Sequence, residues 1–464
     1  MSVLERLGLG SILALHLALG GEYARQTPLW QVPDEPAHYN HLVQLLDAEP
    51  GWPVIEPGDY PFERLEALKA SRFPATASIE GIEYEDHQPP AYYLMATIPF
   101  RLAGEATADR VRLIRLFGLL LGSLTICLAW RAARLLDPDD PLLALGCAGF
   151  VAFLPMQLTM TAAVNNDALA NAVAAAAVCL ALARPNGRVG QRAWVLGGGG
   201  LLGLALLSKL TAVAPVAAAL IASELLAGRQ ATRVERSAAL RRLAPIAGLA
   251  GLLAAPWLLR NARVYGAGDP FGLRAHAWAV ACTPVAACQP RSADWIAERG
   301  LGDMLWRMLR FGFESFWGVF GWMGVFFDRL AGIPIYGLLA LASLLAGIGL
   351  ALALRRIAGD PSAGLARDRL GLLAASAGAT LAAFLIYNLE FVQHQGRYLL
   401  PALLPVGLGF SLGLRELGRW LAGRVGLPQD RSRALADWLP LAFALALLGL
   451  ARLGLYHYIV PGLG

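Results

Sequence analysis

Residues 31–41 read QVPDEPAHYNH and follow the first apolar segment almost immediately. Two carboxylates lie side by side between two prolines, and two histidines follow. The first proline disfavours the helical conformation before it, and the second has its φ fixed near helical values. A helix is therefore predicted to begin here with Asp34 as its N-cap. Continued as a helix, Asp34, His38 and His41 fall at i, i+4 and i+7, on one face.

Three ligand-type side chains on one helix face are enough to hold a divalent metal ion, so Asp34, His38 and His41 are candidate metal ligands. The simpler interpretation is a capped helix that lies on a surface and binds nothing. The stretch by itself does not separate these interpretations, and the rest of the chain supplies the context.

The composition is that of a membrane protein. Of the 464 residues, 56% are hydrophobic and 16% are charged, and the mean hydropathy is +0.51. Several apolar runs approach the roughly 20 residues that cross a bilayer as a helix. We predict one all-α polytopic membrane domain over residues 1–464, with about eleven spans. These spans lie near residues 7–21, 114–133, 141–160, 168–183, 193–208, 210–227, 243–259, 333–354, 370–389, 398–417 and 438–457.

Basic residues set the predicted orientation of the domain. They gather in the short gaps between apolar runs, as at Arg131, Arg134 and Arg419. The positive-inside rule makes these gaps cytoplasmic. The two long connections, 22–113 and 260–332, are then outer loops. The predicted location is a bacterial cytoplasmic membrane, with any chemistry built on its outer, periplasmic face.

One apolar segment does not fit a span. Residues 90–103 are short for a crossing, contain Pro99 and are interrupted by Arg101. Counting them as a span would place every later basic gap on the wrong side, so we predict an interfacial helix in the first outer loop. The first apolar run lacks a good small-x-small cleavage pattern and is predicted to be a retained anchor.

The cysteines agree with this topology. Cys127, Cys147 and Cys179 lie in predicted spans, where a thiol serves as a small apolar side chain. Cys282 and Cys288 share the second outer loop. Their close spacing in an oxidising compartment predicts a disulfide.

Polar and ionisable residues gather at the outer ends of the spans. Asp167 precedes the fourth span, Lys209 lies between the fifth and sixth, and Arg260 ends the seventh. The turn before the tenth span, residues 393–398, reads QHQGRY. Ionisable groups at membrane depth are costly and usually face an interior or an aqueous cavity. These positions therefore indicate one polar site at the outer end of the bundle.

Each of these residues also has a structural alternative. Asp167 can act as a helix N-cap, Lys209 can snorkel to the interface, and Arg397 can pair with Glu390. The aromatic residues between 313 and 327 form either a belt at the membrane boundary or a groove for a sugar or a lipid tail.

Four motifs carry a resemblance to a known family. They are PDEPAH at 33–38, HQPPAYY at 87–93, SFWGVFGWM at 315–323 and QGRYLLP at 395–401. Over nearly the whole chain they resemble a widespread group of bacterial multi-pass proteins. That group is similar to the GT-C superfamily of integral-membrane glycosyltransferases, which includes protein O-mannosyltransferase and lipid A aminoarabinose transferase types.

The resemblance implies a GT-C-like bundle whose extracytoplasmic loops carry interfacial helices. It also implies transfer of a sugar from a polyprenyl-phosphate carrier to an acceptor outside the cytoplasmic membrane. GT-C enzymes have an essential acid in the first outer loop, where Asp34 stands with Glu35 beside it. They also have an Asp at the outer start of the fourth span, which Asp167 matches. Some members have a basic residue next to the first acid, but His38 stands here instead, which leaves the cations for the leaving phosphate open.

The residue types fit this chemistry independently. The sequence shows no glycine motif for a nucleotide and nothing that indicates nucleic acid, and a lipid-linked sugar requires neither. The expected partners are a polyprenyl-phosphate-linked sugar, an envelope glycan, lipid or protein as acceptor, and membrane lipid. Asp34 is the predicted general base, with Glu35 as the second catalytic candidate. The candidate substrate-binding residues are His38, His87, Asp167, Lys209, Arg260, Trp317, Trp322, Gln395, Arg397 and Tyr398; Arg260, Arg397 and Lys209 are the phosphate ligands among them.

A transporter or flippase for lipid-linked sugars is the alternative function. It would use similar basic and aromatic groups. Transporters more often have internal repeats and broken helices with polar groups near the midplane. This sequence has no repeat of fixed period and places its polar groups at one end of the spans, which favours the transferase.

Overall fold

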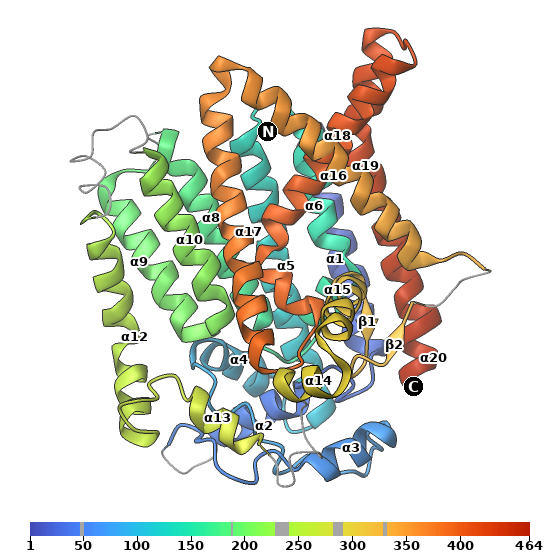
Figure 1. Cartoon of the computed structure of the whole chain (residues 1–464). Coiled ribbons are helices and arrows are strands. Elements are labelled where there is room, and N and C mark those ends of the chain that lie inside the picture. Colours follow the sequence, from blue (N-terminus) through green and yellow to red (C-terminus); the bar gives the residue numbers. More distant parts are fainter. Residues whose placement is uncertain (47–50, 187–188, 228–240, 282–290, 328–331) are drawn as a thin grey trace.

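The computed structural model describes residues 1–46, 51–186, 189–227, 241–281, 291–327 and 332–464. It is almost entirely helical, so the predicted all-α class is confirmed. The long helices run side by side as a bundle, and the short helices gather at one end (Figure 1). The predicted disulfide between Cys282 and Cys288 lies outside the described residues.

The helices of the bundle are α1 (Val3–Gln26), α5 (Thr107–Leu136), α6 (Pro141–Phe153) with its short continuation α7 (Pro155–Thr161), α8 (Asp167–Ala183), α9 (Gln191–Ser208), α10 (Leu210–Ala227), α12 (Ala244–Val264), α16 (Ile335–Gly359), α17 (Gly364–Glu390), α18 (Leu403–Arg424) and α19 (Gln429–Leu453). The shorter elements are α2 (Glu35–Leu46), α3 (Phe62–Ala70), α4 (Ala91–Leu102), η1 (Arg184–Asn186), α13 (Leu273–Ala279), α14 (Ser292–Arg299), α15 (Leu301–Trp317), β1 (Val319–Phe320), β2 (Val325–Phe326), η3 (Pro361–Ala363), η4 (Gly396–Ala402), η5 (Gly454–Ile459) and α20 (Val460–Leu463).

Every predicted span falls on a helix of the bundle. Six of the described helices, α1, α5, α16, α17, α18 and α19 with their flanking turns, are long and apolar enough to cross a membrane. The bent pair α6 and α7 makes seven if it counts as one span. Helices α8 and α10 are apolar but shorter. The protein is therefore a multi-pass membrane protein, and the number of eleven spans stays a prediction.

Three breaks interrupt the helices along the predicted spans or between them. Helices α6 and α7 meet at an angle of 60°. Pro155 begins α7, and a proline disfavours the helical conformation of the residue before it, here the extended Leu154. Lys209 is likewise extended and separates α9 from α10. A 3₁₀ turn, η4, precedes α18. The second and third breaks lie at the end of the bundle covered by the first loop and carry Lys209 and Arg397 there.

Small residues bring α16 and α18 into close contact. A Cβ atom at Gly413 would overlap the backbone oxygen of Ala346, and one at Gly349 would overlap the backbone of Gly413. Such close approach is how helices associate in a membrane, where apolar burial between helices supplies little driving force. Helix α9 packs similarly on α12, α10 on α17, and α19 on α6.

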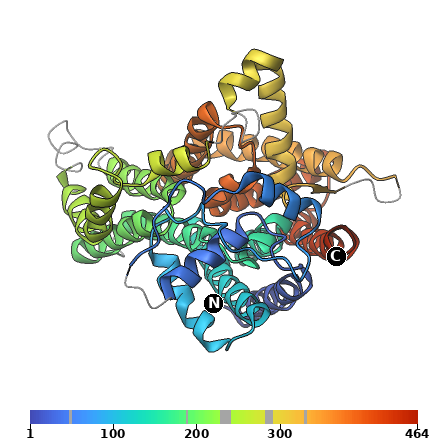
Figure 2. The ribbon, with the colours of Figure 1, turned by 90° about the horizontal axis from the view of Figure 1, so that it is seen from below.

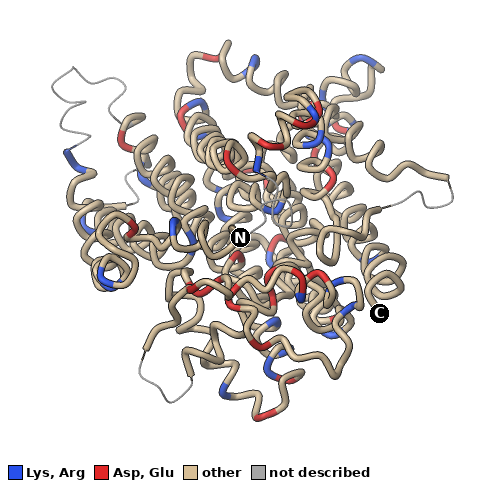
Figure 3. Tube along the Cα trace, turned by 60° about the horizontal axis from the view of Figure 1, so that its bottom comes forward, with Lys and Arg blue, Asp and Glu red and all other residues tan. Residues whose placement is uncertain are grey.

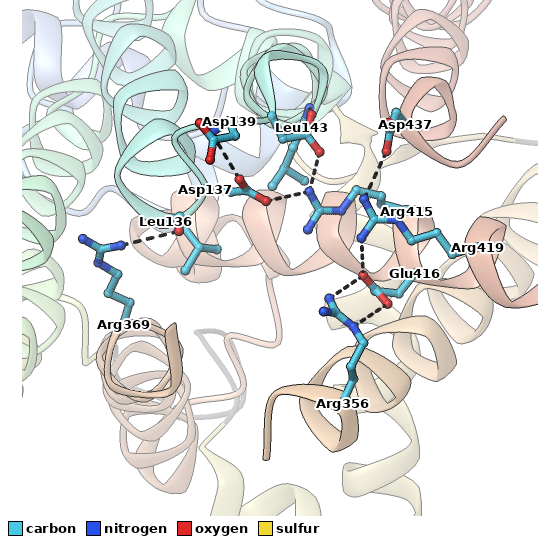
Figure 4. A network of polar contacts seen from close by, with 11 residues as sticks. Leu136, Asp137, Asp139, Leu143, Arg356, Arg369, Arg415, Glu416, Arg419 and Asp437 are labelled. Atoms are coloured by element: carbon cyan, nitrogen blue, oxygen red, sulfur yellow. Dashed lines mark hydrogen bonds and ion pairs between the residues drawn. The ribbon is translucent and has the colours of Figure 1, made fainter. Parts of the chain in front are cut away.

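A network of charged residues joins the helix ends farthest from the short helices (Figure 4). Arg415 on α18 contacts Asp137 and Asp140, which bracket the turn between α5 and α6. The next residue, Glu416, pairs with Arg356 of α16 at 2.8 Å. The network therefore connects four helices through one turn of α18.

The first loop covers the opposite end of the bundle. Seen from below, its blue segments lie across the helix ends (Figure 2). Its acidic residues come forward next to lysines and arginines (Figure 3). The segment predicted to be interfacial is the 12-residue helix α4, which packs against α5, α2 and α9.

A buried ion pair fastens this loop to the bundle. Glu35 at the start of α2 is 0% exposed and Arg115 of α5 is 1% exposed. The pair is bidentate: Arg115 Nη2 donates to Glu35 Oε2 at 2.6 Å and Nε donates to Oε1 at 2.8 Å. The backbone N–H groups of Trp30 and Val164 also donate to Glu35, each at 3.1 Å. The remaining Arg115 donors reach the carbonyls of Ala24, Thr27 and Pro28.

We expect Glu35→Gln to destabilise the protein strongly. The change removes one partner of a fully buried pair and leaves the Arg115 charge uncompensated, which typically costs about 3–5 kcal/mol. Thermal unfolding of the purified protein in detergent should show a much lower midpoint. Glu22→Gln, which opens the exposed Glu22–Arg25 pair, is the control and should unfold like the wild type. Equal midpoints for both variants would contradict the assigned role.

We expect the two ends of the bundle to lie on opposite sides of the membrane. In a cysteine-free background, Glu105→Cys on the side of the first loop should react with an impermeant thiol reagent added outside intact cells. Ser362→Cys, in the turn between α16 and α17, should react only after permeabilisation. Labelling of both from outside would show that the orientation or the span count is wrong.

Candidate functional site

A cavity of about 800 Å³ lies between the first loop and the ends of α10 and α17. It is built from segments far apart in the sequence: the loops around residues 34 and 85, helix α3, the α9–α10 break, α13, the β1–β2 turn and the turn before α18. Its polar lining residues include Asp34, Tyr60, Glu66, Lys69, Tyr84, Glu85, His87, Gln88, Lys209, Thr211, His276, Thr380, Gln393, Gln395, Arg397 and Tyr398.

Asp34 is held in this wall in an unusual backbone conformation. Its φ is +67°, in the left-handed region, which costs a non-glycine residue about 1–3 kcal/mol. It stands immediately before α2, and its backbone carbonyl accepts the N–H of His38 at 3.0 Å. Its carboxylate does not cap the helix as predicted. It accepts Arg397 Nη2 at 2.6 Å and the Tyr84 hydroxyl at 2.9 Å.

The surroundings keep Asp34 ionised. Burial raises the pKa of its carboxyl, but the Arg397 guanidinium and the hydrogen bonds from Arg397 and Tyr84 outweigh burial and hold the pKa below its usual range. At neutral pH the site therefore presents a carboxylate, which can accept a proton and cannot donate one.

Arg397 has donors left for a ligand. Its side chain is 5% exposed, and its Nε has no partner among the described residues. Gly396 allows this placement, because a Cβ there would overlap the backbone of Gly312 and Phe316 in α15. A buried guanidinium with an unused N–H suits a phosphate or carboxylate group.

Lys209 enters the cavity from the extended residue between α9 and α10. Its Nζ donates to Asp167 Oδ1 at 2.6 Å. Asp167 is the first residue of α8 and lies behind Lys209, not in the cavity lining. Asn165 Oδ1 accepts the Asp167 N–H at 3.0 Å. The Asp167 carboxylate thus orients the lysine and neutralises its charge.

The structure does not bring the side chains of the candidate metal ligands Asp34, His38 and His41 together. The left-handed Asp34 turns its carboxylate toward Arg397, while His38 Nδ1 meets the Tyr93 hydroxyl at 2.6 Å. His41 stacks on Tyr93 and lies 3.5 Å from Asp86. Within the described ranges no group of three His, Cys, Asp or Glu side chains could hold a metal ion. Burial is the main cause that lowers the pKa of His38 and of His41 to about 3, so both rings are neutral.

The cavity includes several of the predicted site residues and leaves out others. His87, Trp322, Gln395 and Tyr398 line it together with Asp34, Lys209 and Arg397. Glu35 lies in the buried pair with Arg115 and does not reach the cavity. Arg260 donates to the carbonyls of Trp52 and Pro53 and so holds the first loop, and Trp317 packs among the rings of Phe150, Phe313, Phe316, Phe410 and Phe443.

Sequence reasoning missed part of the site. Tyr84, Glu85 and Gln88 line the cavity, and Lys69 and Glu66 reach it from α3. Tyr84 and Glu85 shortly precede the HQPPAYY motif and Gln88 lies within it, so the motif was a usable signal. The contact between Asp34 and Arg397, 363 positions apart, has no local signature.

Comparisons with known proteins agree with this geometry. The family model described as dolichyl-phosphate-mannose-protein mannosyltransferase matches residues 87–259. No curated protein matches the chain. Among solved structures, ArnT from Cupriavidus metallidurans in the apo state is 16% identical, with 97% of this chain and 72% of that chain covered and a TM-score of 0.50.

Two further structures are similar at lower TM-scores. ArnT from Cupriavidus metallidurans bound to undecaprenyl phosphate is 17% identical, with 97% of this chain and 73% of that chain covered and a TM-score of 0.49. The oligosaccharyltransferase AglB from Archaeoglobus fulgidus, in complex with an inhibitory peptide and a dolichol-phosphate, is 13% identical, with coverages of 99% and 56% and a TM-score of 0.46. The chain has the fold of apo ArnT, and together with the matched family model this confirms the resemblance to the GT-C superfamily of membrane glycosyltransferases.

Proposed function

We propose that this protein transfers a sugar from a polyprenyl-phosphate carrier to an acceptor of the cell envelope, on the outer face of a bacterial cytoplasmic membrane. The observation that carries the proposal is the cavity in which Asp34 is held 2.6 Å from Arg397 and Lys209 projects nearby. The carboxylate of Asp34 beside the cations Arg397 and Lys209, at the loop-covered end of a helical bundle, fits a phosphate-linked substrate.

The phosphate of the carrier would bind between Arg397 and Lys209. Both cations are already oriented by a carboxylate, and Arg397 Nε is an unused donor. One wall of the cavity is formed by α17, through Thr380, Ala383, Phe384, Ile386 and Tyr387. Ile386 in this wall is 66% exposed. This largely apolar wall would let the polyprenyl chain leave the cavity toward the lipid.

The proposed reaction is a displacement at the sugar carbon that bears the phosphate. The acceptor hydroxyl forms the new C–O bond while the C–O bond to the phosphate breaks, and Asp34 accepts the hydroxyl proton. The leaving phosphate takes the bonding electrons, and Arg397 and Lys209 stabilise its added charge. The phosphate also competes with Asp34 for Arg397, which weakens the ion pair that keeps Asp34 a poor base.

The similar proteins support the proposal by what they bind. ArnT, whose fold the chain shares, has been crystallised with undecaprenyl phosphate. The matched family model is described by a dolichyl-phosphate-mannose donor. Undecaprenyl phosphate is a lipid carrier without its sugar, and dolichyl-phosphate-mannose is a carrier with a sugar attached. Both are polyprenyl phosphates, the class of ligand that we propose for the cavity of this chain.

We expect Asp34→Asn to abolish transfer. The amide keeps the shape of the side chain and removes the basic oxygen, and loss of a general base typically costs about 10²–10⁴-fold in rate. The measurement is turnover of a defined polyprenyl-phosphate sugar by purified protein in detergent. Because detergent micelles have no second compartment, a flippase would show no turnover even as wild type. Normal turnover by Asp34→Asn would remove this residue from the chemistry.

We expect Arg397→Gln to weaken carrier binding about ten- to a hundredfold, because a charge-assisted hydrogen bond is worth about 1.5–3 kcal/mol. Equilibrium binding of a polyprenyl phosphate to purified protein is the measurement. Arg310→Gln, an arginine in an exposed pair with Glu314 on α15, is the matched control and should bind as the wild type does. Equal affinities for all three proteins would show that the phosphate binds elsewhere.

A further inference from the structure

The charges at the centre of the cavity cancel in pairs. Asp34 is paired with Arg397, and Asp167 is paired with Lys209, each at 2.6 Å. These two pairs leave no net positive charge for an incoming phosphate. The sign of the net charge at the centre of the cavity therefore depends on the one remaining carboxyl group near these pairs, that of Glu85.

Glu85 lines the cavity without a cationic partner. Gln88 Nε2 donates to its Oε2 at 2.6 Å, and no ion pair with a described residue involves it. The charged groups that act on it come from three separate segments: Asp34 before α2, Lys209 between α9 and α10, and Arg397 in η4. Three tyrosines also face Glu85: Tyr84 from the same loop, Tyr93 from α4 and Tyr387 from α17. His41 contacts only the backbone carbonyl of Glu85.

This environment favours the neutral form of Glu85. Burial is the main cause that raises the pKa of its carboxyl to about 8, and the negative charge of Asp34 raises it further, against Lys209, Gln88 and Arg397. An ionised Glu85 would add an uncompensated negative charge to a cavity whose other central charges already cancel. A neutral carboxylic acid instead offers an O–H donor.

We propose that Glu85 binds as a neutral carboxylic acid and donates a hydrogen bond to the phosphate of the lipid carrier, so that carrier binding is linked to a proton. This inference rests on the proposed function, since it concerns the same phosphate. O–H···O⁻ bonds to an anion are short and strong. The cavity thereby gains a donor for the phosphate without the desolvation cost of a third cation.

The linkage has a defined direction. The affinity of the protein for the carrier phosphate is highest below the pKa of Glu85 in the free protein, because Glu85 then already carries its proton. As the pH rises above about 8, each binding event must first take up a proton, so the affinity falls by about tenfold per pH unit. A ligand whose own charge stays constant across this pH range shows the effect of Glu85 protonation alone.

The test uses the full-length protein in detergent and farnesyl methyl phosphate, a phosphodiester that stays singly charged at neutral and alkaline pH. Its affinity for the wild type should be constant near neutral pH and fall from about pH 8 to about pH 9.5. Glu85→Gln, which keeps an N–H donor and cannot ionise, should show no fall. Glu66→Gln is the matched control: Glu66 lines the same cavity but is paired with Lys69, so this variant should show the wild-type fall.

A second measurement needs no variant. Calorimetry of the wild type near pH 8.5, in buffers of different ionisation enthalpy, should show uptake of a proton on binding. Binding without proton uptake, or a fall in affinity that persists in Glu85→Gln, overturns the inference and leaves the carrier site intact. Absence of binding by the wild type at every pH overturns the proposed function itself.

Discussion

The buried pair of Glu35 and Arg115 is the constraint on which the rest of the site depends. It uses every oxygen and most donors of its two side chains to join the end of α1, the start of α2, α5 and the segment before α8. A buried pair contributes little net stability over an apolar alternative, but its broken form is very costly. Its effect is to define one position for the first loop. Asp34, the next residue back, is thereby turned into the cavity in a left-handed conformation that is disfavoured in a free chain.

A second electrostatic feature of the cavity is that each of its two central cations is paired with a carboxylate. Arg397 is held by Asp34 and Lys209 by Asp167, so neither charge is buried alone before a ligand arrives. Under the proposed function, an incoming phosphate would replace a carboxylate as the partner of a guanidinium. The same exchange would free Asp34 from the ion pair that weakens it as a base. Carrier binding and activation of the base would then follow from one competition.

Helix breaks place these groups. Asp167, Lys209 and Arg397 all lie where a helix starts, stops or changes to a 3₁₀ turn at the same end of the bundle. In a membrane, irregular backbone is tolerated only where protein or water satisfies its polar groups. A polar cavity at that depth meets this requirement. The breaks and the cavity thus explain each other, which is why ionisable residues in otherwise apolar helices were informative.

The sequence by itself determined the class of fold, the positions of the helices and the end of the bundle that carries the site. These features follow from apolar run length and from charges placed at helix ends, both of which are local properties. Lys209 and Arg397 were therefore predicted as members of one site from their positions at helix ends, and the resemblance to a known family added Asp34.

Only the tertiary structure decided what each of these residues does. It separated the neighbours Asp34 and Glu35 into a cavity carboxylate and a buried anchor, and it paired Asp34 with Arg397 across 363 positions. It also assigned Arg260 and Trp317 to packing and brought Glu85 into the cavity. The physical reason is that a carboxylate's role depends on which cation and how much water it meets. Those partners arrive from distant segments and are defined only when the helices pack.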